Sequence, residues 1–161
     1  MDNNSQTVEE VNTVLYDDEK LIGYNTDVEG FMKPLRKNIQ RFNNKKAVIL
    51  GSGGASKAVL YGLINANCKE IIILNRTIEN ARHLVSKLDS DIPISFHELN
   101  QKTIDSLSDI DIMINTVPLH KTNTILNFHS NLGIKLAYDL EYIPKETNFI
   151  KQMKSLNSDL I

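Results

Sequence analysis

The sequence predicts an α/β fold in which helices cover both faces of a doubly wound parallel sheet. Two observations predict it: short apolar runs of the kind that form strands buried on both faces, and helical apolar periodicity between those runs. Strands and helices alternate across short connections, so we expect right-handed crossovers within one sheet. A chain of 161 residues with 41% hydrophobic content can bury a core of that size.

Two smaller elements precede the alternating pattern. Apolar residues at 11–15 and 21–24 flank an acidic turn at 17–19, which is typical of a β-hairpin. A helix is expected at 30–39, despite Pro34 near its first turn. The inner side of this helix carries Phe31, Leu35 and Ile39.

The next stretch of the chain contains two strand and helix pairs. The apolar run 47–50 stops at glycines, as a strand buried on both faces does, and helical spacing from 55 to 65 ends at Asn67. A second apolar run at 70–74 predicts the next strand, and Thr77 stands where its hydroxyl can cap the following helix. The inward face of that helix carries Ala81, Leu84, Val85 and Leu88.

The remaining elements are shorter. Pro93 and Pro118 border them, because proline interrupts regular pairing and favours an extended residue before it. We expect, in order, a strand at 94–96, a short helix at 103–107, and strands at 110–116 and 135–140. The polar segment 38–46 is typical of a linker or of the start of a domain, so we divide the chain into residues 1–40 and a main domain at 41–161.

Charge and cysteine content exclude several classes of protein. A net charge of −2 with scattered Lys and Arg gives no basic surface for nucleic acid. No apolar run approaches the roughly 20 residues that cross a membrane. The single cysteine, Cys68, cannot form an internal disulfide, and the first residues lack secretory features, so a cytoplasmic location fits best. We assign no metal site.

A glycine-rich loop follows the first main-domain strand and opens the next helix, which is the context of a dinucleotide-binding loop. The loop consists of Gly51, Ser52, Gly53, Gly54 and Ala55. Missing side chains let the backbone approach a pyrophosphate, and the free N–H groups of the helix point at it. Ser56 stands where the strict pattern has a third glycine. The loop predicts a Rossmann-type cofactor site, with an ordinary glycine-rich turn as the alternative.

The end of the second main-domain strand distinguishes NAD from NADP. An acidic residue there bonds the ribose 2′-hydroxyl of NAD, whereas a cation accommodates the 2′-phosphate of NADP. This chain has Asn75, Arg76 and Thr77 at that place, without a carboxylate. Because the Arg76 guanidinium can clamp a phosphate through paired hydrogen bonds, NADP is the expected cofactor. An arginine that is merely solvated is the alternative.

Two other sets of polar residues have both a functional and a structural interpretation. Asn115 and Thr116 end the strand at 110–116, at the edge where parallel sheets bind ligands. They either line the nicotinamide ribose or simply terminate the strand. Residues 23–27 gather an amide, a hydroxyl and a carboxylate, and from the local pattern an Asx-type helix cap is favoured over catalysis.

Taken together, these motifs resemble the shikimate dehydrogenase family over residues 11–147. The motifs that carry the resemblance occur in the family's order: Val11-Asn12-Thr13-Val14, Gly23 to Asp27 with Gly30-Phe31, Gly51 to Ala55, Asn75-Arg76-Thr77, Ile114-Asn115-Thr116, and Tyr138-Asp139-Leu140 with Tyr142, Pro144 and Thr147. The resemblance implies reversible hydride transfer between NADPH and the C3 carbonyl of 3-dehydroshikimate, giving shikimate, in aromatic amino acid biosynthesis. It also implies that Asp27 belongs to a catalytic lysine and aspartate pair, and that Asn12 holds substrate hydroxyls.

The resemblance further implies which parts of the family's site this chain lacks. The family's lysine and a pair of substrate-binding hydroxyl residues lie on an N-terminal α/β domain, so residues 1–40 resemble a remnant of that substrate domain. After Thr147 the family continues into a segment with a substrate-contacting glutamine. At 116–120 the chain reads Thr-Val-Pro-Leu-His, where the family commonly has a small residue and a glycine and methionine pair. We therefore expect a truncated or divided form with little or no activity alone.

Three hypotheses follow. In the first, the chain is an NADP-dependent shikimate dehydrogenase that binds shikimate or 3-dehydroshikimate once another chain supplies the missing lobe. In the second, it is a catalytically inactive, truncated NADP-binding module. In the third, the substrate is quinate or aminoshikimate, because the lobe that sets specificity is absent. Self-association is a further expectation, since a fold without one lobe exposes the surface that faces it.

Overall fold

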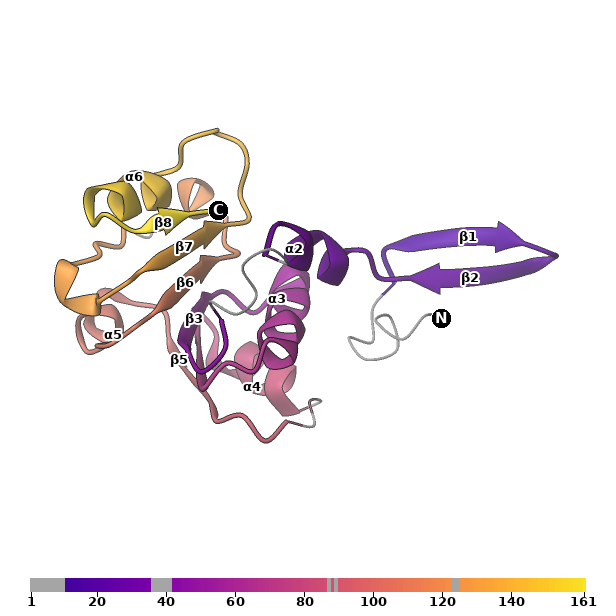
Figure 1. The fold of residues 1–161 in the computed structure, drawn as a ribbon, viewed down its shortest axis with the longest axis horizontal. Helices are drawn as coiled ribbons and strands as arrows, with labels where there is room; N and C mark the ends of the chain where they lie inside the picture. The colour runs from indigo at the N-terminus through magenta and orange to yellow at the C-terminus, as the bar shows by residue number, and fades with distance from the viewer. Residues whose placement is uncertain (1–10, 36–41, 87, 89, 123–124) are drawn as a thin grey trace.

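A six-stranded parallel sheet forms the centre of the fold, in the order β5-β4-β3-β6-β7-β8 (Figure 1). Counted from β3, this is the 3-2-1-4-5-6 order of the Rossmann fold, so the predicted doubly wound class is confirmed. The strands are β3 (Lys46–Leu50), β4 (Glu70–Asn75), β5 (Ile94–Glu98), β6 (Ile112–Asn115), β7 (Leu136–Asp139) and β8 (Asp159–Leu160). The computed structural model describes residues 11–35, 42–86, 88, 90–122 and 125–161.

Helices cover both faces of this sheet (Figure 1). One face packs against α2 (Asp27–Leu35), α3 (Gly54–Asn65) and α4 (Ile78–Ser86). The other face packs against α5 (Gln101–Asp105) and α6 (Asn148–Ser155). Two short 3-10 helices, η2 (Leu119–Lys121) and η3 (Ser130–Leu132), lie in the connection from β6 to β7.

Alternate residues of each central strand enter two different apolar clusters. In β3, Ala47 and Ile49 belong to the cluster with α3 and α4, whereas Val48 and Leu50 belong to the cluster with α5 and α6. All four side chains are fully buried. Burial of a Leu or Ile side chain is worth about 1.5–3 kcal/mol, which explains why both faces of the strand must be apolar.

The predicted elements of the main domain are confirmed with small shifts of their ends. Asn67 takes a left-handed backbone with φ 55° and closes the turn after α3, as expected. The short helix α5 begins before the predicted position, because the Asn100 side chain accepts a hydrogen bond from the Thr103 N–H (2.9 Å) and caps it there. The helix α6 and the strand β8 were not predicted.

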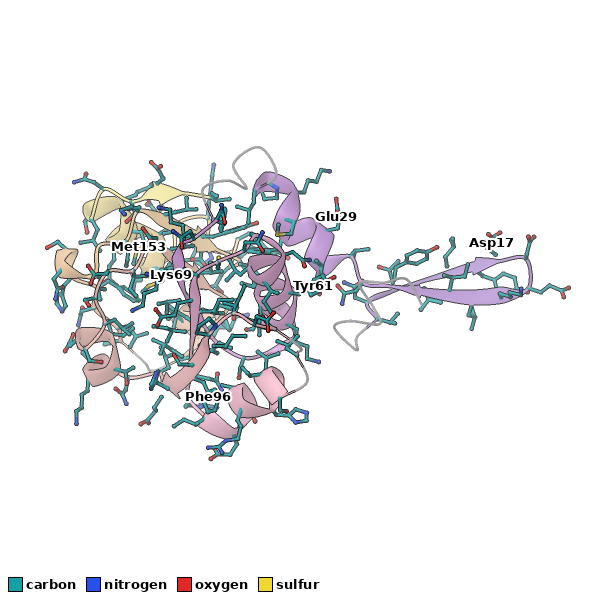
Figure 2. The ribbon with its side chains drawn as sticks, turned by 60° about the horizontal axis from the view of Figure 1, so that its bottom comes forward. Asp17, Glu29, Tyr61, Lys69, Phe96 and Met153 are labelled. Carbon is teal, nitrogen blue, oxygen red and sulfur yellow. The ribbon has the colours of Figure 1, made fainter. Side chains whose placement is uncertain are left out.

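The hairpin at the start of the described chain is also confirmed. Its strands, β1 (Thr13–Asp17) and β2 (Lys20–Tyr24), pair antiparallel. Asp18 and Glu19 join them with φ of 44° and 60°, and positive φ at both central residues is what a two-residue type I′ turn requires. The hairpin projects away from the sheet, with Asp17 near its end (Figure 2). The strand β1 begins and ends two residues later than predicted, and β2 begins one residue earlier, because the turn is formed by Asp18 and Glu19 alone.

The helix α2 connects the hairpin to the main domain. It begins at Asp27, before the expected Gly30, and its expected continuation to Ile39 lies outside the described residues. Phe31 is buried and stacks on Tyr138, with ring centroids 5.3 Å apart. The approach of α2 to α3 is close, since a Cβ on Gly62 would lie 2.9 Å from the Phe31 ring. The predicted domain boundary after residue 40 also falls outside the described residues and stays a prediction.

Candidate functional site

The carboxyl ends of β3 and β6 lie side by side at the centre of the sheet. From β3 the chain continues to β4 on one side, and from β6 it continues to β7 on the other. This reversal of direction creates a crevice, and open α/β sheets bind their ligands in such a crevice. The residues predicted to bind a cofactor lie at this edge, at the ends of β4 and β6, in the loops that follow the strands, and in the first turn of α3.

The glycine loop occupies the crevice end of β3. Gly51 has φ 107°, and a Cβ there would lie 2.4 Å from the Thr116 hydroxyl oxygen. Both facts exclude a larger residue. Gly53, by contrast, has φ −83° and no atom within 4 Å of an added Cβ, so the space beside it is open. The absence of a side chain at Gly53 leaves room that a phosphate group fits.

The first turn of α3 faces the same space. Gly54 and Ala55 are exposed, whereas Ser52 is half-buried. No acidic residue occupies the first turn of this helix, so its positive dipole end is not neutralised from within the helix. Exposed N–H groups at a positive helix end suit an anion such as a pyrophosphate.

Ser56 and Thr116 join the start of α3 to the end of β6. Their hydroxyl oxygens lie 2.7 Å apart, and the Thr116 hydroxyl donates to the Leu50 carbonyl oxygen at 2.7 Å. The Thr116 proton is therefore used, so Ser56 donates to Thr116. Ser56 is fully buried, which confirms that a serine at the third glycine position permits close packing of the helix on the sheet.

A pocket of about 220 Å³ lies at the end of β4. One wall consists of Asn75, Arg76 and Thr77, the opposite wall includes Leu119 and Thr122 from the loop after β6, and no acidic residue lines it. Asn75 donates to the Thr77 carbonyl oxygen (2.8 Å) and so fixes this turn. Arg76 and Thr77 are exposed, and none of the described residues forms an ion pair with Arg76.

Two further pockets continue along the same edge. A pocket of about 320 Å³ shares Val117 with the Arg76 pocket and is lined by Thr116, Pro118 and Tyr142. A third pocket, of about 440 Å³, shares Ala55 and Tyr142 with it. The three pockets therefore form a row that runs from the end of β4, past α3, to the beginning of α2.

The third pocket contains Asp27. This exposed carboxylate begins α2, and its neighbours in the lining include Thr26, Tyr138 and Tyr142. The cap of α2 is Asn25, whose buried side-chain oxygen accepts from the Asp27 N–H at 3.0 Å. The local interpretation of residues 23–27 as a helix cap is thus confirmed for Asn25, and the Asp27 side chain is left facing the pocket. Burial raises the pKa of the Tyr138 phenol, which keeps it a neutral hydrogen-bond donor.

Asn12 does not line any of the three pockets. Its side-chain oxygen accepts hydrogen bonds from the Thr26 N–H and the Thr26 hydroxyl, both at 3.0 Å. The Thr13 hydroxyl donates to the same oxygen at 3.0 Å. Asn12 therefore borders the third pocket only through Thr26, and it fixes the start of the hairpin to the segment before α2.

A buried polar network beneath the pockets was not predicted. Asn115 is fully buried, and its amide nitrogen donates to the Val117 carbonyl oxygen and to Asp139, each at 2.9 Å. Its oxygen accepts from the Val117 N–H at 3.1 Å. Asp139 also accepts from the Thr147 hydroxyl, which caps α6. The Asn115 side chain bonds to the backbone that follows β6, while Thr116 lines the second pocket.

Neither a helix able to span a membrane nor a cluster able to hold a metal is found in the described part of the chain. None of its helices combines the length and the apolar content that crossing a bilayer requires. Within the same residues, no group of three or more His, Cys, Asp and Glu side chains is arranged to hold a metal ion.

Comparison with known proteins gives consistent results. The family model described as shikimate / quinate 5-dehydrogenase matches residues 34–129. The chain is 39% identical to the shikimate dehydrogenase (NADP(+)) of Carboxydothermus hydrogenoformans, covering 93% of this chain and 55% of that protein. It is 34% identical to the enzyme of the same name from Nitrosopumilus maritimus, covering 100% of this chain and 60% of that one. The chain thus spans about half the length of the curated relatives that it matches.

Solved structures agree with the sequence matches. Shikimate dehydrogenase from Aquifex aeolicus superposes with a TM-score of 0.78 at 31% identity, over 99% of this chain and 57% of that one. A shikimate dehydrogenase solved in complex with NADP+ gives a TM-score of 0.77 at 31% identity, with 99% and 57% covered.

Proposed function

Since the chain belongs to the shikimate / quinate 5-dehydrogenase family, we propose that it binds NADP along its row of pockets and contributes to reversible hydride transfer between NADPH and 3-dehydroshikimate. The observation that carries this proposal is the row itself, with a cation at one end, a glycine loop beside its middle and a carboxylate at the other end. That order of groups matches the chemistry of a phosphorylated dinucleotide placed next to a polar substrate.

Each part of the row suits one part of the cofactor. Arg76 would hold the 2′-phosphate, with Asn75 and Thr77 shaping the turn around it. The open space at Gly53 and the start of α3, with Ser52, Gly54 and Ala55, would hold the pyrophosphate. Thr116 would border the nicotinamide half, and Asn115 would act from below by fixing the backbone after β6. When bound, the cofactor supplies the hydride chemistry.

The third pocket would hold the substrate. Asp27 would orient a cationic lysine that lies on polypeptide outside these 161 residues, which keeps a proton donor near the reacting oxygen. The phenols of Tyr138 and Tyr142 are available to hydroxyl and carboxylate groups of a small cyclic acid. Asn12 would contribute to the substrate site by holding Thr26 at the pocket wall.

Turnover is proposed to require more polypeptide than this chain contains. The relatives named for the activity extend well beyond the match, which covers 55% and 60% of their lengths. The exposed apolar residues of the hairpin support a docking surface for that additional lobe, or for a second copy of the chain. A chain without the lobe would bind NADP but transfer hydride slowly or not at all.

The proposal is tested by calorimetric titration of the chain with NADP and with NAD, followed by an absorbance assay with shikimate. NADP should bind more tightly than NAD, and Arg76→Ala should weaken NADP roughly tenfold or more while leaving NAD unchanged, because a hydrogen bond to a charged group is lost. Arg82→Ala is the matched control, since Arg82 lies on α4 over the Phe96 ring and outside the pocket. Equal binding of both nucleotides, or an equal effect of both variants, would overturn the cofactor assignment.

The assay with shikimate separates the remaining hypotheses. NADP binding with turnover supports a dehydrogenase, and replacing shikimate by quinate in the same assay tests the substrate. NADP binding without turnover, even after a complementary lobe is added, supports the inactive binding module instead.

A further inference from the structure

An extended segment, Leu126 to Phe128, lies between α5 and α6 in the connection from β6 to β7. Among the described residues it pairs with no strand of the six-stranded sheet. Leu126 and Phe128 are buried and Asn127 is exposed. The buried backbone groups outside a sheet must still find partners, because leaving them unpaired is costly. Two glutamine side chains provide these partners.

Gln101 pairs with one edge of the segment. Its amide nitrogen donates to the Asn127 carbonyl oxygen, and its amide oxygen accepts from the Asn127 N–H, each at 2.9 Å. Gln152 pairs with the other edge in the same way, donating to the Leu126 carbonyl oxygen and accepting from the Phe128 N–H, again at 2.9 Å. Successive backbone groups of an extended chain point to opposite sides, so the two glutamines replace the two neighbours of a central strand.

The apolar side chains of the segment pack into the core of the domain. Leu126 and Phe128 are buried in the apolar cluster with α5 and α6. Phe128 meets Phe149 of α6 edge-on, with ring centroids 5.7 Å apart. The apolar contacts hold the segment down, whereas the paired hydrogen bonds fix its position along its own axis. A slip by one residue would exchange buried and exposed side chains.

The loop that leads to this segment forms one wall of the Arg76 pocket. Thr116, at the start of the loop, is fixed by its hydrogen bonds to Leu50. Leu119 and Thr122 also line a pocket of about 420 Å³ together with Gln152, and Leu119 packs against the same apolar cluster as Leu126 and Phe128. The wall residue Leu119 and the segment therefore rest on one shared set of apolar contacts.

We propose that Gln101 and Gln152 are positioning residues that fix the loop wall of the 2′-phosphate pocket through the backbone of Leu126 to Phe128. This inference rests on the proposed NADP binding. None of the hydrogen bonds described for the two glutamines reaches a residue of the Arg76 pocket, so their effect on the nucleotide passes through the segment and the apolar contacts that it shares with Leu119. The part of the cofactor that they influence most is the adenosine 2′-phosphate half, which is nearest to Leu119 and Thr122.

The variants that test this are Gln152→Met and Gln101→Met, which keep the side-chain length and remove the amide. Lys151→Met is the matched control on the exposed side of α6. Hydrogen exchange should rise at least about tenfold at the Leu119 and Lys121 N–H groups in the glutamine variants, because these amides donate to the Val117 and Pro118 carbonyl oxygens of the loop itself. Gln152→Glu, which keeps the acceptor for Phe128, should give an intermediate increase.

The second measurement is the affinity for adenosine 2′,5′-bisphosphate and for NADP, at a temperature where circular dichroism shows every variant folded. Both ligands should bind roughly tenfold more weakly to Gln152→Met, the size expected when one or two hydrogen bonds no longer hold the wall. Increased exchange without a loss of affinity, or a loss of thermal stability without increased loop exchange, overturns the inference. Failure of the unmodified chain to bind either ligand counts against the proposed function. In that case, unchanged hydrogen exchange in the loop of the glutamine variants still overturns the positioning role of Gln101 and Gln152.

Discussion

The sheet and the hairpin contain similar apolar residues in opposite surroundings. In β3 every residue after Lys46 is buried, whereas Val14, Tyr16 and Leu21 of the hairpin are 60%, 69% and 75% exposed. Strand pairing in the hairpin is local and follows from its two-residue turn. Burial requires a second layer. The helices α3 and α5 form such a layer on the sheet, whereas none of the described elements forms one on the hairpin. The comparison teaches that pairing and burial are specified separately in this chain.

The largest difference between the two regions is expected for glycine substitutions. Gly51→Ala should lower the free energy of unfolding by about 2–4 kcal/mol, because it combines an unfavourable positive φ with a clash against Thr116. Gly23→Ala in the hairpin is the counterpart, since its Cβ would meet only the Val11 side chain, at 2.8 Å, which can move. We expect a cost below about 1 kcal/mol there. Urea unfolding measures both, and similar costs would contradict the geometry of the glycine loop.

Two leucines test burial directly. Leu50→Ala should lower the free energy of unfolding by about 2–5 kcal/mol, because it leaves a cavity in a fully buried site. Leu21→Ala should change it by less than about 0.5 kcal/mol, because that side chain is 75% exposed. A large loss for Leu21→Ala in urea unfolding, growing with protein concentration, would mean that a second copy covers the hairpin in solution.

The smallest effect is electrostatic and lies at the amino edge of the sheet. Burial would raise the pKa of Asp111, but the Lys135 ammonium (2.8 Å), the Lys46 N–H (3.2 Å) and the nearby Lys45 outweigh it and lower the pKa below 3.8. The contribution of Asp111 to stability is therefore complete above its unfolded pKa and disappears as the pH falls through the lowered folded value.

Asp111→Asn tests this contribution. It should cost less than about 1 kcal/mol at neutral pH, because the ion pair is partly exposed, and the difference from the unmodified chain should shrink between about pH 5 and about pH 2. Asp17→Asn, which changes an exposed carboxylate at the end of the hairpin, is the control. Thermal unfolding across that pH range measures it, and a difference that grows on acidification would contradict the sign.

Much of the fold could be predicted from the sequence because its signals are local. The apolar run before Gly51 and the helical spacing after it are read from neighbouring residues, and so is the turn at Asp18 and Glu19. The end of the chain was different. The helix α6 has only eight residues, so the cap at Thr147 and the apolar spacing of Phe149, Ile150 and Met153 were missed, and β8 has only two residues, which pair with β7.

The residues of the candidate site likewise differ in whether the sequence alone predicts their roles. The glycine loop and Arg76 are contiguous motifs whose positions follow from the strand order. The role of Asn115 depends on Asp139, its partner across β6 and β7, and that register exists only in the folded sheet. The paired hydrogen bonds of Gln101 and Gln152 join residues from two helices to a third segment, so no spacing along the chain reveals them.

The strand order has a consequence for the time course of folding. The hairpin joins adjacent residues and can close within about 1–10 μs. The central strand β3 pairs with β4 after one crossover but with β6 only after two intervening strand and helix units. Parallel pairings of such long separation form slowly, because the closure of the loop precedes the contacts that reward it. The crevice between β3 and β6, central in space, is therefore expected to be among the last features of the molecule to appear.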